Sequence, residues 1–183
     1  MLLLGGASRR FGAPKALARL DGETLAERAW RVLGEVCDER LAVGKARDEL
    51  SLPFRVLDDA TPVRAPMAGV VAGLRAASNE LCVFLPVDCP RVSGQTLLRL
   101  AAEAADAAVP QTGPLPGAYR RGALPTLERS LAREEYSLRD ALRSLEVAVV
   151  ELDPAELVNV NTQAELRAVA AFHADAALED TAP

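Results

Sequence analysis

Short apolar runs alternate along the chain with stretches in which apolar residues recur every three or four positions. The runs are rich in Val, Leu and Phe, and they predict strands at residues 1–4, 40–43, 54–57, 81–85, 107–109, 118–120 and 147–152. Strands that alternate with helices are typical of βα units around a mostly parallel sheet, so we expect an α/β fold.

The helical stretches fall between these strands. The first begins after Thr24, where Thr24 and Glu27 have the spacing of a capping box. Further helices are expected at residues 67–77, 93–105, 124–133 and 138–145. A second capping box, Thr162 with Glu165, opens a last helix that we expect to run to about Phe172.

Length and composition indicate one domain. The chain has 183 residues, of which 50 percent are hydrophobic and 26 percent charged, enough for one compact core and marginal for two. No linker or repeat interrupts residues 1–173, which we expect to form that domain. The small and polar residues 174–183 are expected to fray as a C-terminal tail.

The charge balance and the short apolar runs argue against two classes of partner. The 21 basic and 26 acidic side chains give a net charge of −5, so we expect no nucleic-acid partner. No apolar run approaches the roughly 18 residues of a membrane span. The opening run ends at Leu4, too early for a signal peptide, so we expect a cytoplasmic protein without a membrane partner.

The cysteine and histidine counts limit the chemistry further. Cys37, Cys82 and Cys89 form no C-x-x-C pair and His173 is the single histidine, which argues against a zinc site or a disulfide framework. Cys82 lies in an apolar run and is expected to be a small buried hydrophobe. One histidine leaves little for Ser-His or Cys-His catalysis. The chemistry should therefore use carboxylates, backbone amides, Lys or Arg.

Lysine is almost absent from the chain. Of the 21 basic residues, 19 are Arg and the other two are Lys15 and Lys45. Lys15 lies in a Gly-rich loop, and the presence of Lys there in a chain that otherwise uses Arg indicates that Arg could not replace it at this position. Lys45 is expected at the surface, without a role in a site.

The turn after the first strand has the composition of a phosphate cradle. Gly5 and Gly6 leave a buried strand, where positive φ would let successive backbone N–H groups converge on an anion. Arg9, Arg10 and Lys15 add cations to the loop. The spacing fits neither the Walker A loop nor G-x-G-x-x-G, and a plain Gly-rich surface turn remains the alternative.

Carboxylates follow two predicted strands. Asp88 ends the apolar run LCVFLPV, and ligands in open α/β sheets bind beyond the carboxyl ends of strands. A carboxylate there suits Mg²⁺, although Asp88 could instead cap the turn. Asp58 and Asp59 end another strand. Neighbouring side chains of an extended chain point in opposite directions, so at most one should serve the site, and we favour Asp59.

Asn159 and Asn161 alternate in the segment LVNVN. In an extended segment they lie on one face and can offer amide groups to metal or phosphate. The alternative is that this segment serves only to present Thr162 as a helix cap.

The opening segment LLLGGASRRFGAPKALARLDGETL resembles the signature of the molybdenum cofactor guanylyltransferases, the MobA family within the wider class of nucleotidyltransferases. The fixed positions of that signature are held here by Gly5, Gly6, Ser8, Arg10, Gly12 and Lys15. Two positions depart from it. Phe11 stands where Met is usual, and Pro14 stands where Asp is usual, which removes a polar group beside Lys15.

Three later segments resemble the same family in the same order. The second block of the family is similar to VLDDATPVRAPMAGVVAGL, except that the family usually has Gly where this chain has Ala65. The family's metal-binding strand end is similar to FLPVDCPRV, and its closing block is similar to NVNTQAEL. Together the four blocks cover most of residues 1–172. The resemblance implies a three-layer α/β/α fold with a mostly parallel, Rossmann-like central sheet.

The resemblance also implies a reaction. GMP passes from GTP to the terminal phosphate of molybdenum-bearing molybdopterin, and pyrophosphate is released. GTP would lie over the N-terminal half and the pterin phosphate toward the C-terminal half. A transient contact with cofactor-delivering proteins or molybdoenzymes would fit this role.

The resemblance also implies roles for individual residues of this chain. Lys15, Arg10 and Asp88 are the expected catalytic residues, and Asp88 would hold Mg²⁺. The expected nucleotide-binding residues are Leu3, Leu4, Gly5, Gly6, Ser8, Lys15, Asp59 and Asp88. Asp59 would accept hydrogen bonds from guanine N1 and N2.

Two alternatives remain open at this point. A sister enzyme that uses CTP, or a nucleotidyltransferase for sugar phosphates, would share the loop and Asp88, but such relatives more often have Ala-Gly in place of Gly5 and Gly6. A catalytically silent nucleotide-binding regulator is supported only by Pro14.

Overall fold

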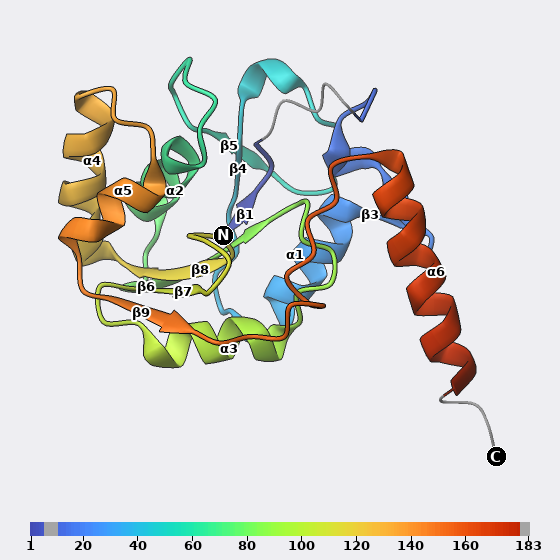
Figure 1. Ribbon diagram of the computed structural model, residues 1–183. Coiled ribbons are helices and arrows are strands. Elements are labelled where there is room, and N and C mark those ends of the chain that lie inside the picture. Colours follow the sequence, from blue (N-terminus) through green and yellow to red (C-terminus); the bar gives the residue numbers. More distant parts are fainter. Residues whose placement is uncertain (6–10, 180–183) are drawn as a thin grey trace.

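The computed structural model describes residues 1–5 and 11–179, with the side chains described as far as residue 171. Its centre is a seven-stranded sheet with the strand order β5-β4-β1-β6-β8-β7-β9 (Figure 1). The strands are β1 (Leu2–Leu3), β4 (Ala42–Gly44), β5 (Val56–Asp58), β6 (Leu81–Pro86), β7 (Ala107–Pro110), β8 (Gly117–Arg120) and β9 (Val147–Val150). Each predicted apolar run supplies one of these strands.

The sheet is mostly parallel, as the alternation of strands and helices predicts. Only β8, among the strands of this sheet in the described ranges, runs antiparallel to its neighbours β6 and β7. The pairs β5–β4, β4–β1, β1–β6 and β7–β9 are parallel. Their carboxyl ends therefore gather at one edge of the molecule.

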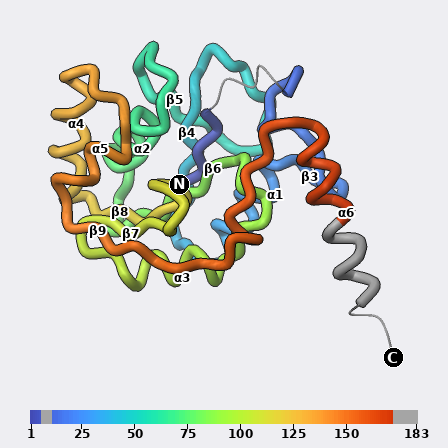
Figure 2. Tube along the Cα trace, viewed as in Figure 1, coloured from blue at the N-terminus to red at the C-terminus, as the bar shows by residue number. Residues whose placement is uncertain are grey.

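Helices cover both faces of the sheet and make the three layers. One face carries α1 (Leu25–Val36) and α3 (Gly94–Glu103), and the other carries α2 (Pro66–Ala76), α4 (Leu124–Ala132) and α5 (Leu138–Ala141) (Figures 1 and 2). The expected α/β/α fold is confirmed. Two apolar clusters fill the spaces on either side of the sheet, one around Leu2 and Leu33 and the other around Phe84 and Tyr119.

Both predicted capping boxes are present. The backbone N–H of Glu27 donates to the Thr24 hydroxyl at 3.1 Å, and that of Glu165 donates to the Thr162 hydroxyl at 3.2 Å. The second box opens α6 (Gln163–Glu179). The sequence pattern predicts the end of this helix at about Phe172, but the helix continues into the residues that we expected to form a frayed tail. The sequence there is rich in Ala, the residue with the highest helix propensity, and this favours continuation.

A small hairpin was not predicted by the apolar pattern. Strands β2 (Arg19–Leu20) and β3 (Glu23–Thr24) pair in antiparallel fashion around Asp21 and Gly22, both at positive φ. Two positive φ values in a two-residue loop are typical of a type I′ turn, and the Asp-Gly pair is its usual sequence. The strands are too short to show alternation, so this dipeptide is the only signal.

The strand order places a crevice at the middle of the sheet. Strands β4 and β5 lie on one side of β1, and β6, which comes later in the chain, lies on the other side. The strand order therefore reverses between β1 and β6, and open α/β sheets bind ligands at such a topological switch point. Helix α2 packs closely above β1, because a Cβ at Gly69 would lie 3.0 Å from the Cδ2 atom of Leu3. In the described part of the chain, no helix is long and apolar enough to span a membrane.

Candidate functional site

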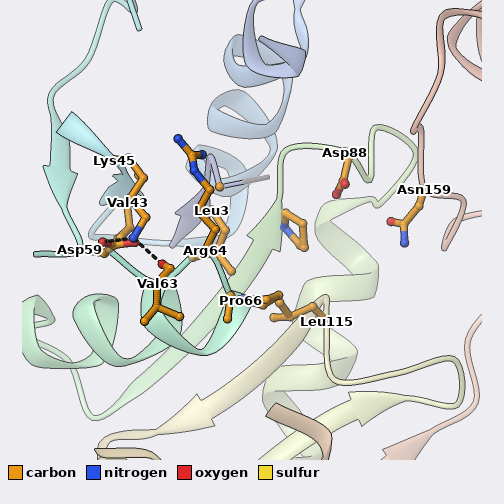
Figure 3. Close-up of a pocket in the computed structure, with 15 residues that line it drawn as sticks. Leu3, Val43, Lys45, Asp59, Val63, Arg64, Pro66, Asp88, Leu115 and Asn159 are labelled. Atoms are coloured by element: carbon orange, nitrogen blue, oxygen red, sulfur yellow. Dashed lines mark hydrogen bonds and ion pairs between the residues drawn. The ribbon is translucent and has the colours of Figure 1, made fainter. Parts of the chain in front are cut away.

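A cavity of about 250 Å³ opens at this switch point. Residues at or just beyond the carboxyl ends of β1, β4, β5 and β6 line it, together with the first turn of α2. Figure 3 shows Lys45 and Asp59 on one side of the cavity and Asp88 and Asn159 on the other, with Leu3 and Pro66 between them. The cavity therefore has two polar ends joined by an apolar middle.

Asp88 and Asn159 line the cavity at its first polar end, and Lys15 and Asn161 lie directly beside Asp88. The ammonium group of Lys15 lies 3.1 Å from Asp88 Oδ2 and donates a hydrogen bond of 2.8 Å to Asn161 Oδ1. The side chain of Lys15 is 11% exposed and that of Asp88 is 27% exposed. Three segments far apart in sequence thus bring a cation, a carboxylate and an amide to one point.

The segment of Asn159 is tied to this end by two further contacts. The backbone N–H of Val160 donates to the carbonyl of Asp88 at 2.8 Å, and the buried Cys89 thiol donates to Asn159 Oδ1 at 2.8 Å. Burial, and then the charge of Asp88, raise the pKa of Cys89, so the thiol stays protonated and serves as a donor. With Oδ1 occupied, the Asn159 amide N–H groups are available to the cavity, which Asn159 lines.

Asp59 and Lys45 form the second polar end. Asp59 follows β5 and its side chain is only 7% exposed, whereas Asp58 is exposed at the surface. The ammonium group of Lys45 lies 2.6 Å from Asp59 Oδ1 and also donates to the carbonyls of Thr61 and Val63 at 2.5 and 2.6 Å. The expectation that one member of the Asp pair faces the crevice agrees with this placement.

The expectation for Lys45 was wrong. Its side chain is 5% exposed and lines the cavity instead of lying at the surface. The physical reason is its position directly after β4, at the same edge of the sheet as Asp88, where the buried carboxylate of Asp59 needs a counter-charge. Both lysines of this Arg-rich chain therefore lie in the candidate site.

The middle of the cavity is apolar, with Leu3, Val43 and Leu115 among its lining residues. Arg64 stands at its margin, and Asp48 holds the Arg64 guanidinium by contacts of 2.6 and 3.3 Å. An apolar slot of this kind accepts a flat ring system, while the polar ends fix its orientation.

The residues of the first loop are placed in part. Leu3 and Gly5 line the cavity, whereas Leu4, expected to bind the nucleotide, is buried in the core and is not among the lining residues. Positive φ among the described glycines occurs at Gly12 and Gly22, so the positive φ expected of the Gly5–Gly6 pair is not found at Gly5, and Gly6 lies outside the described residues.

Four further positions lie outside the described residues: Gly6, Ser8, Arg9 and Arg10. Their expected roles in the phosphate cradle stay predictions.

The donor set of the first polar end suits a hard cation with few protein ligands. Within the described ranges there is no cluster of three or more His, Cys, Asp or Glu side chains that would form an all-protein metal cage. Mg²⁺ instead uses one or two carboxylates and fills its other positions with water and phosphate oxygens. Asp88, partly exposed to the cavity, meets that requirement.

Sequence reasoning missed Lys45, Arg64 and Leu115 as cavity residues. Lys45 carried two usable signals, since it follows a strand directly and is one of only two lysines. Leu115 lies in the loop between β7 and β8, and no local pattern indicates that this loop folds back over the cavity.

Comparison with known protein families and structures gives a consistent result. Residues 1–150 match the MobA-like NTP transferase domain. A Bacillus subtilis protein named probable molybdenum cofactor guanylyltransferase is 33% identical, with 89% of this chain and 89% of that protein covered. A protein of the same name from Rhodopirellula baltica is 34% identical, with 91% of this chain and 88% of that protein covered.

Solved structures show the same similarity. The crystal structure of molybdopterin-guanine dinucleotide biosynthesis protein A from Archaeoglobus fulgidus superposes with a TM-score of 0.79 at 25% identity, covering 95% of this chain and 97% of that one. The 2-C-methyl-D-erythritol 4-phosphate cytidylyltransferase of Thermus thermophilus shares the fold, with a TM-score of 0.73 at 20% identity and coverage of 94% and 98%.

Proposed function

The chain belongs to the MobA-like NTP transferase family, and on that premise we propose that it is a molybdenum cofactor guanylyltransferase. It joins the GMP part of GTP to the terminal phosphate of molybdenum-bearing molybdopterin and releases pyrophosphate. The product is molybdopterin guanine dinucleotide. The relatives that carry the name of this activity match the chain over nearly its whole length.

The two polar ends of the cavity suit the two ends of a nucleotide. Lys15 belongs to the loop after β1 that the sequence predicts to be a phosphate cradle, and it places a cation beside Asp88. The Asp59 side chain is buried next to the apolar middle of the cavity, and this combination suits a purine base. GTP would therefore lie across β1, with its base toward β4 and β5.

Asp59 is suited to guanine in particular. Guanine presents two adjacent donors, N1–H and N2–H, while adenine presents an acceptor at N1. A carboxylate has acceptors only and hydrogen-bonds the first edge. Lys45 and the Thr61 N–H satisfy Oδ1, so the selectivity would rest on Oδ2, which disfavours a base that turns an acceptor toward it.

Asp88 would hold Mg²⁺, which when bound supplies positive charge to the phosphate oxygens. Lys15 adds a second cation within 3.1 Å of the same carboxylate. Asn159 offers amide donors on the cavity side. These residues together would neutralise the charge that grows on the departing pyrophosphate.

The transfer itself needs little proton chemistry. A terminal phosphate oxygen of the molybdopterin bonds to the α-phosphorus of GTP, the bond from that phosphorus to the bridging oxygen of the β-phosphate breaks, and pyrophosphate leaves with the electron pair. A phosphate monoester is already anionic near neutral pH, so no general base is required. This agrees with a chain that contains a single histidine, His173. Catalysis reduces to positioning and charge stabilisation.

The acceptor would approach from the C-terminal half. The cavity is bounded on that side by Leu115, from the loop between β7 and β8, and by Asn159. An apolar side chain beside an amide donor suits a pterin that carries a phosphate. A transient contact with the proteins that supply or receive the cofactor would fit this role.

One observation carries the proposal: a single cavity joins the buried carboxylate of Asp59, for the base, to Asp88 and Asn159, and Lys15 adds a cation beside Asp88 for the phosphates. The test is a competition in which the protein receives equal GTP and CTP with Mg²⁺ and molybdenum-bearing molybdopterin. Mass spectrometry of the product should find the guanine dinucleotide in large excess. A cytosine dinucleotide as main product, or no dinucleotide, would overturn the proposal.

A further inference from the structure

All three N–H groups of the Lys45 ammonium are used by the protein. An ammonium group has three donors. Those of Lys45 lie within hydrogen-bond distance of Asp59 Oδ1, the Thr61 carbonyl and the Val63 carbonyl, at 2.6, 2.5 and 2.6 Å. Lys45 therefore has no donor left for a ligand, although it lines the cavity.

The same contacts fix the carboxylate of Asp59. Its Oδ1 atom accepts from Lys45 and also from the backbone N–H of Thr61 at 3.2 Å. No described residue bonds Oδ2, and no buried side-chain nitrogen or oxygen of the described residues lacks a partner, so Oδ2 keeps some exposure on a side chain that lines the cavity. One oxygen of Asp59 is thus anchored and the other is presented.

Lys45 also shapes the wall of the cavity. Residues 59–65 connect β5 to α2, and Lys45, directly after β4, binds this connection at three points. Val63 is one of the residues that line the apolar slot. The position of Val63 and the direction of the Asp59 carboxylate therefore depend on one cation.

We propose that Lys45 is the positioning residue that sets the base selectivity of the nucleotide site, by holding Asp59 so that one oxygen faces the guanine N1 and N2 donors. The proposal rests on the proposed function and assigns the selectivity to a residue that touches the base only through Asp59. Lys45 acts before the ligand arrives, because its contacts are complete without it.

The geometry demands Lys at this position. Three acceptors converge on one nitrogen, which suits a compact ammonium, whereas a planar guanidinium spreads its donors over a wide fork. Arg47 provides the contrast in the same region. It is exposed and reaches the same connection by a single contact of 3.4 Å to the carbonyl of Pro62.

The test exchanges the two cation types at these two positions. Lys45→Arg is compared with the matched control Arg47→Lys, and the Kd values of GTP and ITP are measured by calorimetry with Mg²⁺, beside kcat and KM for GTP. ITP lacks the 2-amino group, so the ratio of the two Kd values reports the Asp59 contact. Lys45→Gln, which is neutral and has two donors, is measured in parallel so that the result does not depend on one variant.

The Kd of GTP should rise at least about tenfold in the Lys45 variants, and the Kd values of GTP and ITP should lie within about twofold of each other. The kcat of these variants should stay within about threefold of wild type. Arg47→Lys should keep the wild-type Kd ratio. Lys45 variants that retain the wild-type GTP to ITP ratio would overturn the inference, including variants that lose affinity for both nucleotides equally. A wild-type protein that binds CTP in preference to GTP would instead refute the proposed function.

Discussion

Replacing Lys15 with Arg tests the phosphate end of the site without changing its charge. The Lys15 ammonium is 11% exposed and lies between two fixed oxygens, Asp88 Oδ2 at 3.1 Å and Asn161 Oδ1 at 2.8 Å. A guanidinium is broader and cannot occupy the point where these two contacts meet. Pro14 directly before Lys15 has its φ fixed, here at −58°, which restricts the backbone shift that would admit the larger group.

The size of the loss follows from the contacts. Losing one hydrogen bond between charged groups costs about 1.5 to 3 kcal/mol. At about 1.4 kcal/mol for each factor of ten, turnover should fall about 10- to 150-fold. The loss should appear in kcat, because the cation acts mainly on charge that develops as pyrophosphate departs.

The assay is steady-state pyrophosphate release at saturating GTP with molybdenum-bearing molybdopterin. Lys45→Arg cannot serve as a control, because Lys45 lines the cavity. Arg19→Lys is the better match, since Arg19 is exposed and lies four positions further along the same segment. Wild-type turnover in Lys15→Arg would refute the reasoning and leave the loop to act through its backbone and Arg10.

Two further predictions concern the metal and the base. Asp88→Asn should abolish Mg²⁺-dependent nucleotidyl transfer and leave the circular dichroism spectrum unchanged, because it removes the charge that would hold the cation and keeps the shape of the side chain. The control is Asp58→Asn, at the exposed end of β5. Full activity of Asp88→Asn would return Asp88 to a turn-capping role. GTP with Mg²⁺ should raise the melting temperature well above the effect of CTP or ATP, by about 5 to 10 °C at a concentration near 100 times Kd, since that excess adds about 2.7 kcal/mol to the free energy of unfolding. A larger shift with CTP would replace the guanylyl assignment with a cytidylyl one.

The strands of the central sheet and most helix boundaries could be predicted because the chain alternates apolar runs with amphipathic stretches. The direction of β8 could not, because strand polarity depends on connections that a local pattern does not report. The β2–β3 hairpin has strands of two residues, so only Asp21 and Gly22 could have indicated it.

The candidate site was predictable where chemistry and strand ends coincide, as at Asp88 and Asp59. The resemblance to the MobA family added Lys15 and the direction of the reaction. Lys45 was missed because burial of a charged side chain depends on a partner that is 14 residues away and becomes visible only in the fold. Leu115 was missed for the same reason, since its place in the cavity depends on the packing of a loop.

The most direct test of the proposed guanylyl transfer follows two phosphates of GTP separately. The protein is incubated with Mg²⁺, molybdenum-bearing molybdopterin and GTP labelled either at the α-phosphate or at the γ-phosphate. The account predicts that the α-label enters the dinucleotide cofactor and that the γ-label appears in pyrophosphate, in equal amounts. A γ-label transferred to the molybdopterin, or an α-label that stays in free nucleotide, would contradict it.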